Sequence, residues 1–353
     1  MRSSPAKLTA DALSVPGWAE AVETYFDRGW SDGLPVVPAT EDSVHACLDA
    51  AGLDPGAIVL TEPVRRRAVT AEKIAINAVL AGCRPEYMPV LLAALEAMAD
   101  PAFTLHGAIT STGGSATLVI VNGPVREALG FNSGTNVFGP GWRANATVGR
   151  ALRLITLNAL GAQPGTLDRS TQGHPGKYTY CIAENEEANP WEPLHVTRGF
   201  AREASTVTVF AAEGPHNILS HYGETADAIV VAVADAMAGL GSFSRGESVV
   251  VLAPEHVAML ARDGWTKPRI REALYARARR TRADLKRGGK LAGAVIPDDE
   301  THWIHRGTGP DDIHIVVAGG GAGGHSAFIP SWSRERNSLA VTREIRPARG
   351  GPP

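Results

Sequence analysis

The side chains that could do chemistry gather in residues 170–200, STQGHPGKYTYCIAENEEANPWEPLHVTRGF. Four carboxylates fall within nine positions of this stretch, at Glu184, Glu186, Glu187 and Glu192. Carboxylates so close repel one another, so at least one of them needs a cation, a metal ion or a proton. The nearest cations in sequence are Lys177, Arg198 and Arg202.

Two interpretations of this acidic stretch stay open. As a metal site it would combine Glu184 or Glu187 with His195, because carboxylate oxygen and imidazole nitrogen are ligands of zinc, iron and manganese. A divalent metal is therefore a candidate cofactor, with Glu187 and His195 as its first candidate ligands. As a solvated loop, the stretch would pair its acids with local arginines.

Aromatic residues interspersed with the acids favour partial burial, because aromatic side chains at such density usually pack. They are Tyr178, Tyr180, Trp191 and Phe200. We therefore expect residues 166–205 to form a connector that lines a site, with Glu184 and Glu187 as acid–base groups.

Three further residues are candidates for catalysis. His216 and His221, in EGPHNILSHYGE, are five positions apart, whereas a spacing of four aligns two ligands on a helix face. A general acid or base is the better role for them. Cys83 directly precedes Arg84 and a helix-starting proline, so its thiol could have a lowered pKa and act as a nucleophile, or it could be an inert core residue.

Candidate anion anchors come from two loops. Arg143 and Asn145 stand where a glycine-rich loop meets the start of a helix, and Lys177 lies in a turn of the connector. A second loop has Gly319, Gly321 and Gly324 in the order of the dinucleotide fingerprint. No βαβ unit can follow in the 29 residues after it, so we expect no nicotinamide cofactor, although its amides could hold an anion.

The elements that must position these residues follow an α/β pattern. Buried-strand patterns such as SATLVIVNGP alternate with helical ones such as ANATVGRALRLITLNALG. Thr40 and Thr70 are expected helix N-caps, and Gly52 an expected helix end.

The order of elements repeats along the chain. LLAALEAM corresponds to VVAVADAM, ATLVIVNGPVREALG to ESVVVLAPEHVAMLA, and VGRALRLITLNAL to RIREALYARARRT. This pattern predicts an internal duplication, with two pseudo-symmetric α/β units and a ligand cleft between them. The alternative is that any two α/β units look alike. The expected division is an N-terminal helical extension (1–58), a first unit (59–165), the connector (166–205) and a second unit (206–353).

Composition limits the function classes. A net charge of -3 gives no general attraction to nucleic acid or to an anionic membrane, and we expect the basic stretch 267–290 to be a solvated helix face. No signal-peptide pattern and no apolar run of about 18 residues is present, so we predict a cytoplasmic protein without a membrane span. The three cysteines have no close pair and are expected to be reduced thiols.

Four stretches resemble a family of uncharacterised bacterial proteins: WSDGLPVVPAT, NAVLAGCRPEYMPVLLAALEAM, GPGWRANATVGRALRLI and GKYTYCIAENEEANPWEPLH. Members occur beside, or fused to, a small cysteine or selenocysteine domain named for its UGSC motif. The resemblance spans most of residues 24–345 and implies a thiol or selenol protein partner. It brings no reaction and no residue roles. LAPEHVAMLARDGWTKPRIREALYARA is more faintly similar to the second domain of lactate-racemase-like proteins, a likeness of fold that transfers no function.

Three functional hypotheses follow. The first is an enzyme of lyase or hydrolase type that acts on a small, polar, anionic metabolite in the cleft between the units, as a monomer or a homo-oligomer. The second is a non-catalytic large subunit that works with a separate thiol or selenol redox protein. The third is a module that binds a metabolite without turnover.

Overall fold

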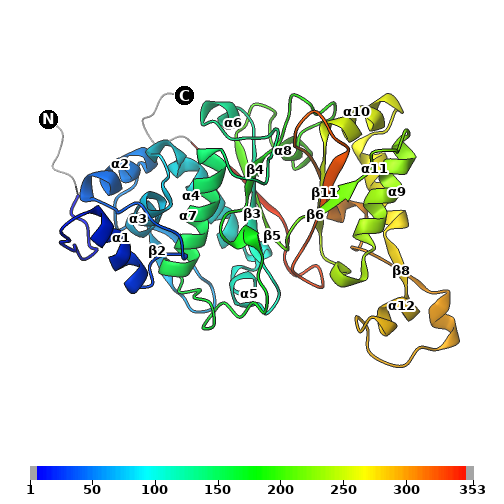
Figure 1. Cartoon of the computed structure of the whole chain (residues 1–353), viewed down its shortest axis with the longest axis horizontal. Helices are drawn as coiled ribbons and strands as arrows, with labels where there is room; N and C mark the ends of the chain where they lie inside the picture. The colour runs from blue at the N-terminus through cyan, green and yellow to red at the C-terminus, as the bar shows by residue number, and fades with distance from the viewer. Residues whose placement is uncertain (1–5, 347–353) are drawn as a thin grey trace.

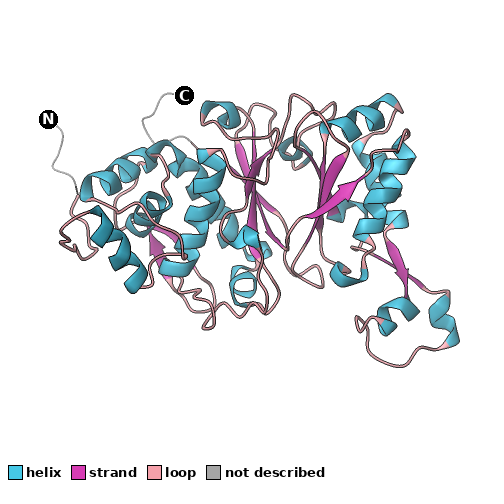
Figure 2. Cartoon of the chain, in the orientation of Figure 1, coloured by secondary structure: helices cyan, strands magenta, loops and turns pink. Residues whose placement is uncertain are grey.

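The computed structural model describes residues 6–346, and these form four layers in the order helices, sheet, sheet, helices (Figure 1). Two sheets lie face to face in the middle, and helices cover the outer face of each (Figure 2). The expected α/β fold class is confirmed.

The first helical layer contains most of the N-terminal part of the chain. Its elements are α1 (Trp18–Asp27), α2 (Glu41–Ala51), the hairpin β1 (Ile58–Thr61) and β2 (Ala68–Thr70), α3 (Ala71–Ala81), α4 (Met88–Ala99), α5 (Leu105–Thr110) and α7 (Arg143–Leu154). The expected caps are confirmed. Thr40 and Ser43 form a capping box at α2, and the Thr70 hydroxyl accepts a hydrogen bond at the start of α3. Gly52 ends α2 with a φ of 62°, a conformation that glycine adopts without strain.

The first sheet has the strand order β12-β5-β3-β4. Its strands are β3 (Ala116–Asn122), β4 (Cys181–Ala183), β5 (Thr206–Ala212) and β12 (Val341–Glu344). β3 pairs in parallel with β4 and antiparallel with β5, and β12 pairs antiparallel with β5. Short helices α6 (Val125–Ala128) and α8 (Leu194–Thr197) lie at the ends of these strands.

The second sheet has the order β10-β7-β11-β6 and repeats this pattern of pairing. Its strands are β6 (His216–Leu219), β7 (Ser248–Leu252), β10 (Ile313–Val317) and β11 (His325–Pro330). β10 and β7 pair in parallel, whereas β11 pairs antiparallel with both β7 and β6. Helices α9 (Ala226–Met237), α10 (Pro254–Arg262) and α11 (Lys267–Arg277) cover its outer face.

The sequence matches between the halves fall on equivalent elements. LLAALEAM lies in α4 and VVAVADAM in α9, and the two matched strand segments are β3 and β7. Both strands lead through a proline into a short helix. The duplication itself stays a prediction.

The chain does not leave the first sheet at residue 206, because β5 and β12, which both follow this expected boundary, belong to the first sheet. β5 belongs to the first sheet, and the chain then passes through residues 213–215 to β6 in the second sheet. β11 belongs to the second sheet, and the chain returns to the first as β12. The two crossings touch, since the Glu213 amide donates to the Pro330 carbonyl at 3.0 Å. If the chain is divided after β6, each half contributes an edge strand to the other half's sheet: β6 from the first half and β12 from the second.

The middle of the interface is packed, which corrects the expected open cleft. Leu118 and Phe210 from the first sheet join Val249, Val251 and Ile329 from the second in one buried apolar cluster. Alternate residues on the same strands face the outer helices, as period-two side-chain alternation requires. A ligand site between the units can thus lie only at the rim of this core.

The stretch 267–290 also differs from the single solvated helix that we expected. It contains α11, then β8 (Arg279–Thr281), then α12 (Arg282–Arg287). β8 pairs with β9 (Trp303–His305), and the Thr281 hydroxyl caps α12, so these residues form a small arm beside the second sheet (Figure 1).

Candidate functional site

The connector crosses from one sheet to the other directly after β4. The Asn185 amide donates to the Val317 carbonyl at 2.7 Å, which ties the end of β4 to the end of β10. The chain then loops through α8 and returns to the first sheet as β5. The connector therefore contacts both sheets, and part of its charge is buried.

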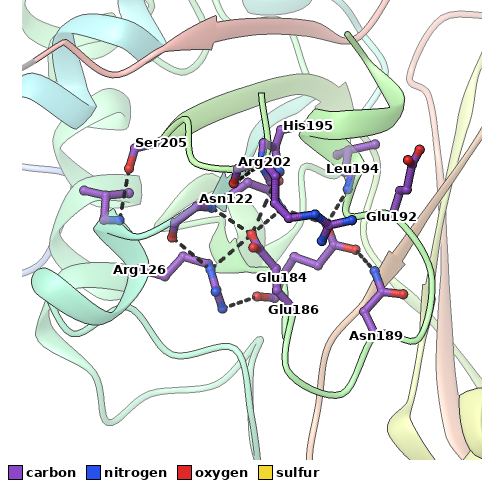
Figure 3. A network of polar contacts seen from close by, with 12 residues as sticks. Asn122, Arg126, Glu184, Glu186, Asn189, Glu192, Leu194, His195, Arg202 and Ser205 are labelled. Atoms are coloured by element: carbon purple, nitrogen blue, oxygen red, sulfur yellow. Dashed lines mark hydrogen bonds and ion pairs between the residues drawn. The ribbon is translucent and has the colours of Figure 1, made fainter. Parts of the chain in front are cut away.

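Glu184 holds this crossing together (Figure 3). Its carboxylate is 0% exposed. Oε2 accepts hydrogen bonds from Asn122 Nδ2 and the Leu194 amide, both at 2.7 Å, and Oε1 accepts one from Asn189 Nδ2 at 2.9 Å. Because every one of these donors comes from the protein and no water reaches the group, Glu184 positions the connector. This corrects its expected role as an acid–base group.

Lys267 supplies the matching charge from the second unit. Its Nζ lies 3.6 Å from Glu184 Oε1 and donates to the carbonyls of Glu192 at 2.6 Å and Ile315 at 3.1 Å. Burial lowers the pKa of Lys267, while the nearby Glu184 acts in the opposite direction. The ammonium therefore fastens the connector to the first turn of α11.

Glu186 and Glu187 find their cation in Arg126, which lies far from them in sequence. Arg126 donates to both oxygens of Glu187, at 2.8 and 3.1 Å, and its Nε lies 3.2 Å from Glu186 Oε1. The hydrogen bond from Arg126 lowers the pKa of Glu187 below its usual range. Within residues 6–346, the nearest cations in sequence, Lys177, Arg198 and Arg202, form no ion pair with these two acids. An ion-paired Glu187 is also a poor general base.

His195 lies against Glu186 rather than Glu187, which corrects the expected metal pair. The ring is 0% exposed, its Nδ1 lies 3.9 Å from Glu186 Oε1, and its Nε2 lies 3.1 Å from the Arg202 carbonyl. Nδ1 has no hydrogen-bond partner among the described residues. Within residues 6–346 no group of three or more His, Cys, Asp or Glu side chains has the arrangement to hold a metal ion.

A pocket of about 500 Å³ opens beside this network, between the connector and the start of α11. Its walls come from the connector and from the second unit. They are Asn189, Pro190, Trp191, Glu192, Thr197 and Arg202 of the connector, with Thr266, Lys267, Pro268 and Arg271 from the second unit. This volume lies in the range of small-molecule sites.

The pocket is electropositive. Lys267, Arg202 and Arg271 line it, whereas Glu192 is the one carboxylate among its described lining residues. Within residues 6–346 neither Arg202 nor Arg271 forms an ion pair, and Arg271 Nε is buried without a hydrogen-bond partner. Burial lowers the pKa of Arg271, with Asp311 acting in the opposite direction. A buried guanidinium nitrogen without a partner is costly, so the pocket favours an anion.

The three expected anion anchors lie elsewhere and hold the fold together. Lys177 Nζ forms an ion pair with Asp168 at 2.6 Å and a hydrogen bond with Ser170. Arg143 Nε donates to the Gly82 carbonyl at 2.9 Å. Asn145 is buried, and its amide contacts the backbone of Asn132 and Cys181. The structure does not bring these three side chains together.

His216 and His221 lie at opposite ends of the edge strand β6, on the side of the second sheet away from β10 and the connector. His216 packs beside Phe328, and burial lowers its pKa. His221 stacks edge-on against the exposed ring of His325, with ring centroids 5.0 Å apart. Neither histidine lines the pocket of Arg271.

Cys83 has the opposite character to an activated thiol. Its Sγ donates to the Thr147 carbonyl at 3.3 Å, and burial raises its pKa to about 12. Arg143 lowers this pKa only slightly against that cost, and Arg84 is not among the groups that affect it. The inert-core interpretation of Cys83 is the one that its surroundings support.

Sequence reasoning missed the residues that line the pocket from the second unit. Lys267 and Arg271 belong to a stretch with ten basic residues, where charge alone favours a solvent-facing helix. The one sequence feature that could have indicated them is the proline at the second position of α11, because it marks the start of a helix. In the structure this helix start lies against the connector. Arg126 gave no signal, because only the fold brings it to Glu187.

Comparison with models of protein families, with curated proteins and with solved structures found no match for this chain. In the described part of the chain no single helix has the length and apolar character needed to cross a membrane. The helical segments Pro85–Ala99 and Pro101–Thr110 have this length and apolar character only when they are taken together, and a bend of 74° separates them.

Proposed function

We propose that the protein binds a small anionic metabolite in the pocket between the connector and α11. The observation that supports this most directly is Arg271, whose buried Nε lacks a partner within a pocket that also contains Lys267 and Arg202. Arginine presents a planar fork of donors that matches a carboxylate or a phosphate, so an anion would complete the hydrogen bonds that the protein leaves open.

The remaining pocket residues suit a compact polar ligand. Trp191 and two prolines give an apolar wall, and Thr197 and Thr266 add hydroxyl groups. The Trp191 indole already donates to the Trp265 carbonyl at 3.0 Å, which fixes this wall to the second unit. The ligand would therefore contact the connector and the second unit at once.

For the reaction we propose acid–base chemistry of lyase or hydrolase type, with Glu192 as the base. Glu192 lines the pocket together with Lys267 and Arg271. There it could remove a proton from the bound substrate, or from a water molecule that attacks it, while the cations stabilise the negative charge that develops. This replaces the expected roles of Glu184, Glu187, His216, His221 and Cys83.

Binding is tested by titrating the protein with inorganic phosphate and with small mono- and dicarboxylates, followed by calorimetry. We expect at least one of these anions to bind, and Arg271→Ala to weaken its binding by about tenfold or more. Arg277→Ala is the matched control, because Arg277 lies on the same helix but pairs with Asp227 outside the pocket. Equal affinities for the wild type and both variants would refute the proposed site.

Turnover is tested separately by incubating the protein in D₂O with the carboxylate that binds best. If Glu192 removes a proton from carbon, NMR will show exchange of the hydrogen next to the carboxylate, and Glu192→Gln will abolish the exchange while it leaves binding intact. Binding without exchange or hydrolysis would instead indicate a protein that captures a metabolite.

A second candidate is the non-catalytic large subunit with a separate thiol or selenol partner. It is favoured by the burial of Cys47, Cys83 and Cys181, whose pKa values burial raises. Thiol chemistry at such residues is suppressed, so another polypeptide would have to provide it. Co-purification of a small Cys- or Sec-containing protein, with activity only in the complex, is the test.

A further inference from the structure

A second cavity, of about 720 Å³, lies in the N-terminal helical layer and plays no part in the site above. Residues 8–15, α1, α2, the β1–β2 hairpin, α3 and the end of α7 surround it. Most of its lining is apolar, including Leu13, Tyr25, Trp30, Ile76 and Leu80. It is larger than the pocket of Arg271, and its volume suits a drug-sized molecule.

One polar group in this cavity is left without a partner. Asn158 donates from Nδ2 to the Trp30 carbonyl at 3.0 Å and to Asn77 Oδ1 at 2.8 Å. These bonds fix the orientation of its amide, because Asn77 is itself buried and bonded to the Lys73 carbonyl. Asn158 Oδ1 is then buried with no hydrogen-bond donor among the described residues.

The backbone at Asn158 is also irregular. Residues Ile155–Ala159 form a single π-helical turn at the end of α7, where the Leu160 amide donates to the Ile155 carbonyl. An extra residue in a helical turn costs stability and is often retained at functional sites. Here the turn places Asn158 in the cavity wall.

Charges of both signs line the cavity and balance each other. Arg67 and Lys73 are matched in number by Asp11 and Glu41. The wall therefore has no net charge, in contrast to the cationic pocket of Arg271. This balance favours a neutral ligand.

We propose that this cavity is a second binding site, for a neutral, mostly apolar small molecule with an N–H or O–H group that donates to Asn158 Oδ1. The apolar body of the ligand would lie against Tyr25, Trp30 and Leu80. Its donor would satisfy the buried Asn158 Oδ1, to which no described residue donates.

The test uses N-phenyl-1-naphthylamine, a neutral apolar dye with one N–H group, whose fluorescence rises in apolar surroundings. We expect saturable binding to the full-length protein. The N-methyl derivative of the dye keeps the apolar body and lacks the donor, so it should bind with an affinity at least about fivefold lower. Equal affinity for the two dyes would overturn the hydrogen bond to Asn158.

The location is tested with a variant that fills the cavity. Ala68 lies in its wall on β2, so Ala68→Trp should abolish dye binding, whereas Ala276→Trp on the exposed side of α11 should not. Hydrogen exchange of the wild-type protein checks the same point without a substitution. The dye should protect residues 8–30 and 155–162, and protection only elsewhere would overturn the proposal.

Discussion

Glu184 of the connector and Lys267 of the second unit place their charged groups 3.6 Å apart at the rim of the sheet sandwich, and both side chains are buried. Glu184 also accepts a hydrogen bond from Asn122 of the first unit, and Lys267 donates to the carbonyl of Glu192 in the connector, so the pair joins three segments at one point. Burying two charges is costly, and such a pair stabilises a fold only when its hydrogen bonds are complete.

This relationship predicts a large loss of stability when either partner is removed alone. Lys267→Met should lower the free energy of unfolding by about 3–5 kcal/mol, because it leaves an uncompensated buried carboxylate. Glu184→Gln together with Lys267→Met should cost less than the sum of the single changes. Urea unfolding of the four proteins measures this coupling, and additive losses would show that the pair acts independently.

For Arg271 we predict that its replacement removes anion binding but does not lower the stability of the protein. In anion-free buffer, Arg271→Leu should keep or raise the melting temperature, because it removes a buried donor without a partner. An anion at 100 times its Kd should stabilise the wild type by about 2.7 kcal/mol and leave the variant unchanged. Thermal unfolding with and without phosphate or a carboxylate is the measurement. A variant that the anion still stabilises would place the site elsewhere.

The cysteines predict slow reaction with thiol reagents. Burial raises the pKa of Cys47 to about 11 and that of Cys83 to about 12, so few thiolates exist at neutral pH. In native protein a disulfide reagent such as 5,5′-dithiobis(2-nitrobenzoic acid) should modify none of the three thiols over minutes. All three should react in guanidinium chloride. Fast modification of one native thiol would contradict the inert role.

The hydrogen bonds that Glu72 accepts lead us to predict that residues 8–15 lose their structure at acid pH. Its carboxylate accepts hydrogen bonds from Thr9 and Ala10, at 2.6 to 2.9 Å, and so holds residues 8–15 over the second cavity. Burial raises the pKa of Glu72, but these hydrogen bonds lower it more, so the folded pKa lies below its ordinary value.

A folded pKa below the unfolded value means that Glu72 stabilises the protein above about pH 4.3 and ceases to do so as the pH falls through the folded pKa. Below that range, hydrogen exchange in residues 8–15 should accelerate before the rest of the chain unfolds. Glu72→Gln should show fast exchange already at neutral pH. Thr24→Ala, which alters α1 without touching Glu72, is the control.

The sequence predicted what depends on local patterns. The caps at Thr40, Gly52 and Thr70 follow from backbone chemistry within a few residues, and the buried strands follow from runs of β-branched residues. The connector was also recognised, since acids and aromatics so densely mixed must meet partners.

The identity of those partners could not be predicted, because it depends on which strands pair and on how the two sheets pack together. Glu187 pairs with Arg126 and Glu184 with Lys267, across 61 and 83 residues respectively. Sequence proximity favoured Lys177 instead, whose charge is taken by Asp168. The sequence also gave no reason to expect that the centre of the interface is filled, since apolar strands facing a second sheet look the same as apolar strands facing helices.

The positions of β6 and β12, each at the edge of the other half's sheet, determine how the chain would behave if it were cleaved. A polypeptide cut near residue 222, between β6 and α9, would give two pieces, and each would lack one edge strand of its own sheet and carry an edge strand that belongs to the other sheet. We expect neither piece to fold alone. When mixed, the two should reassemble, because each supplies the strand that pairs with the exposed edge of the other's sheet.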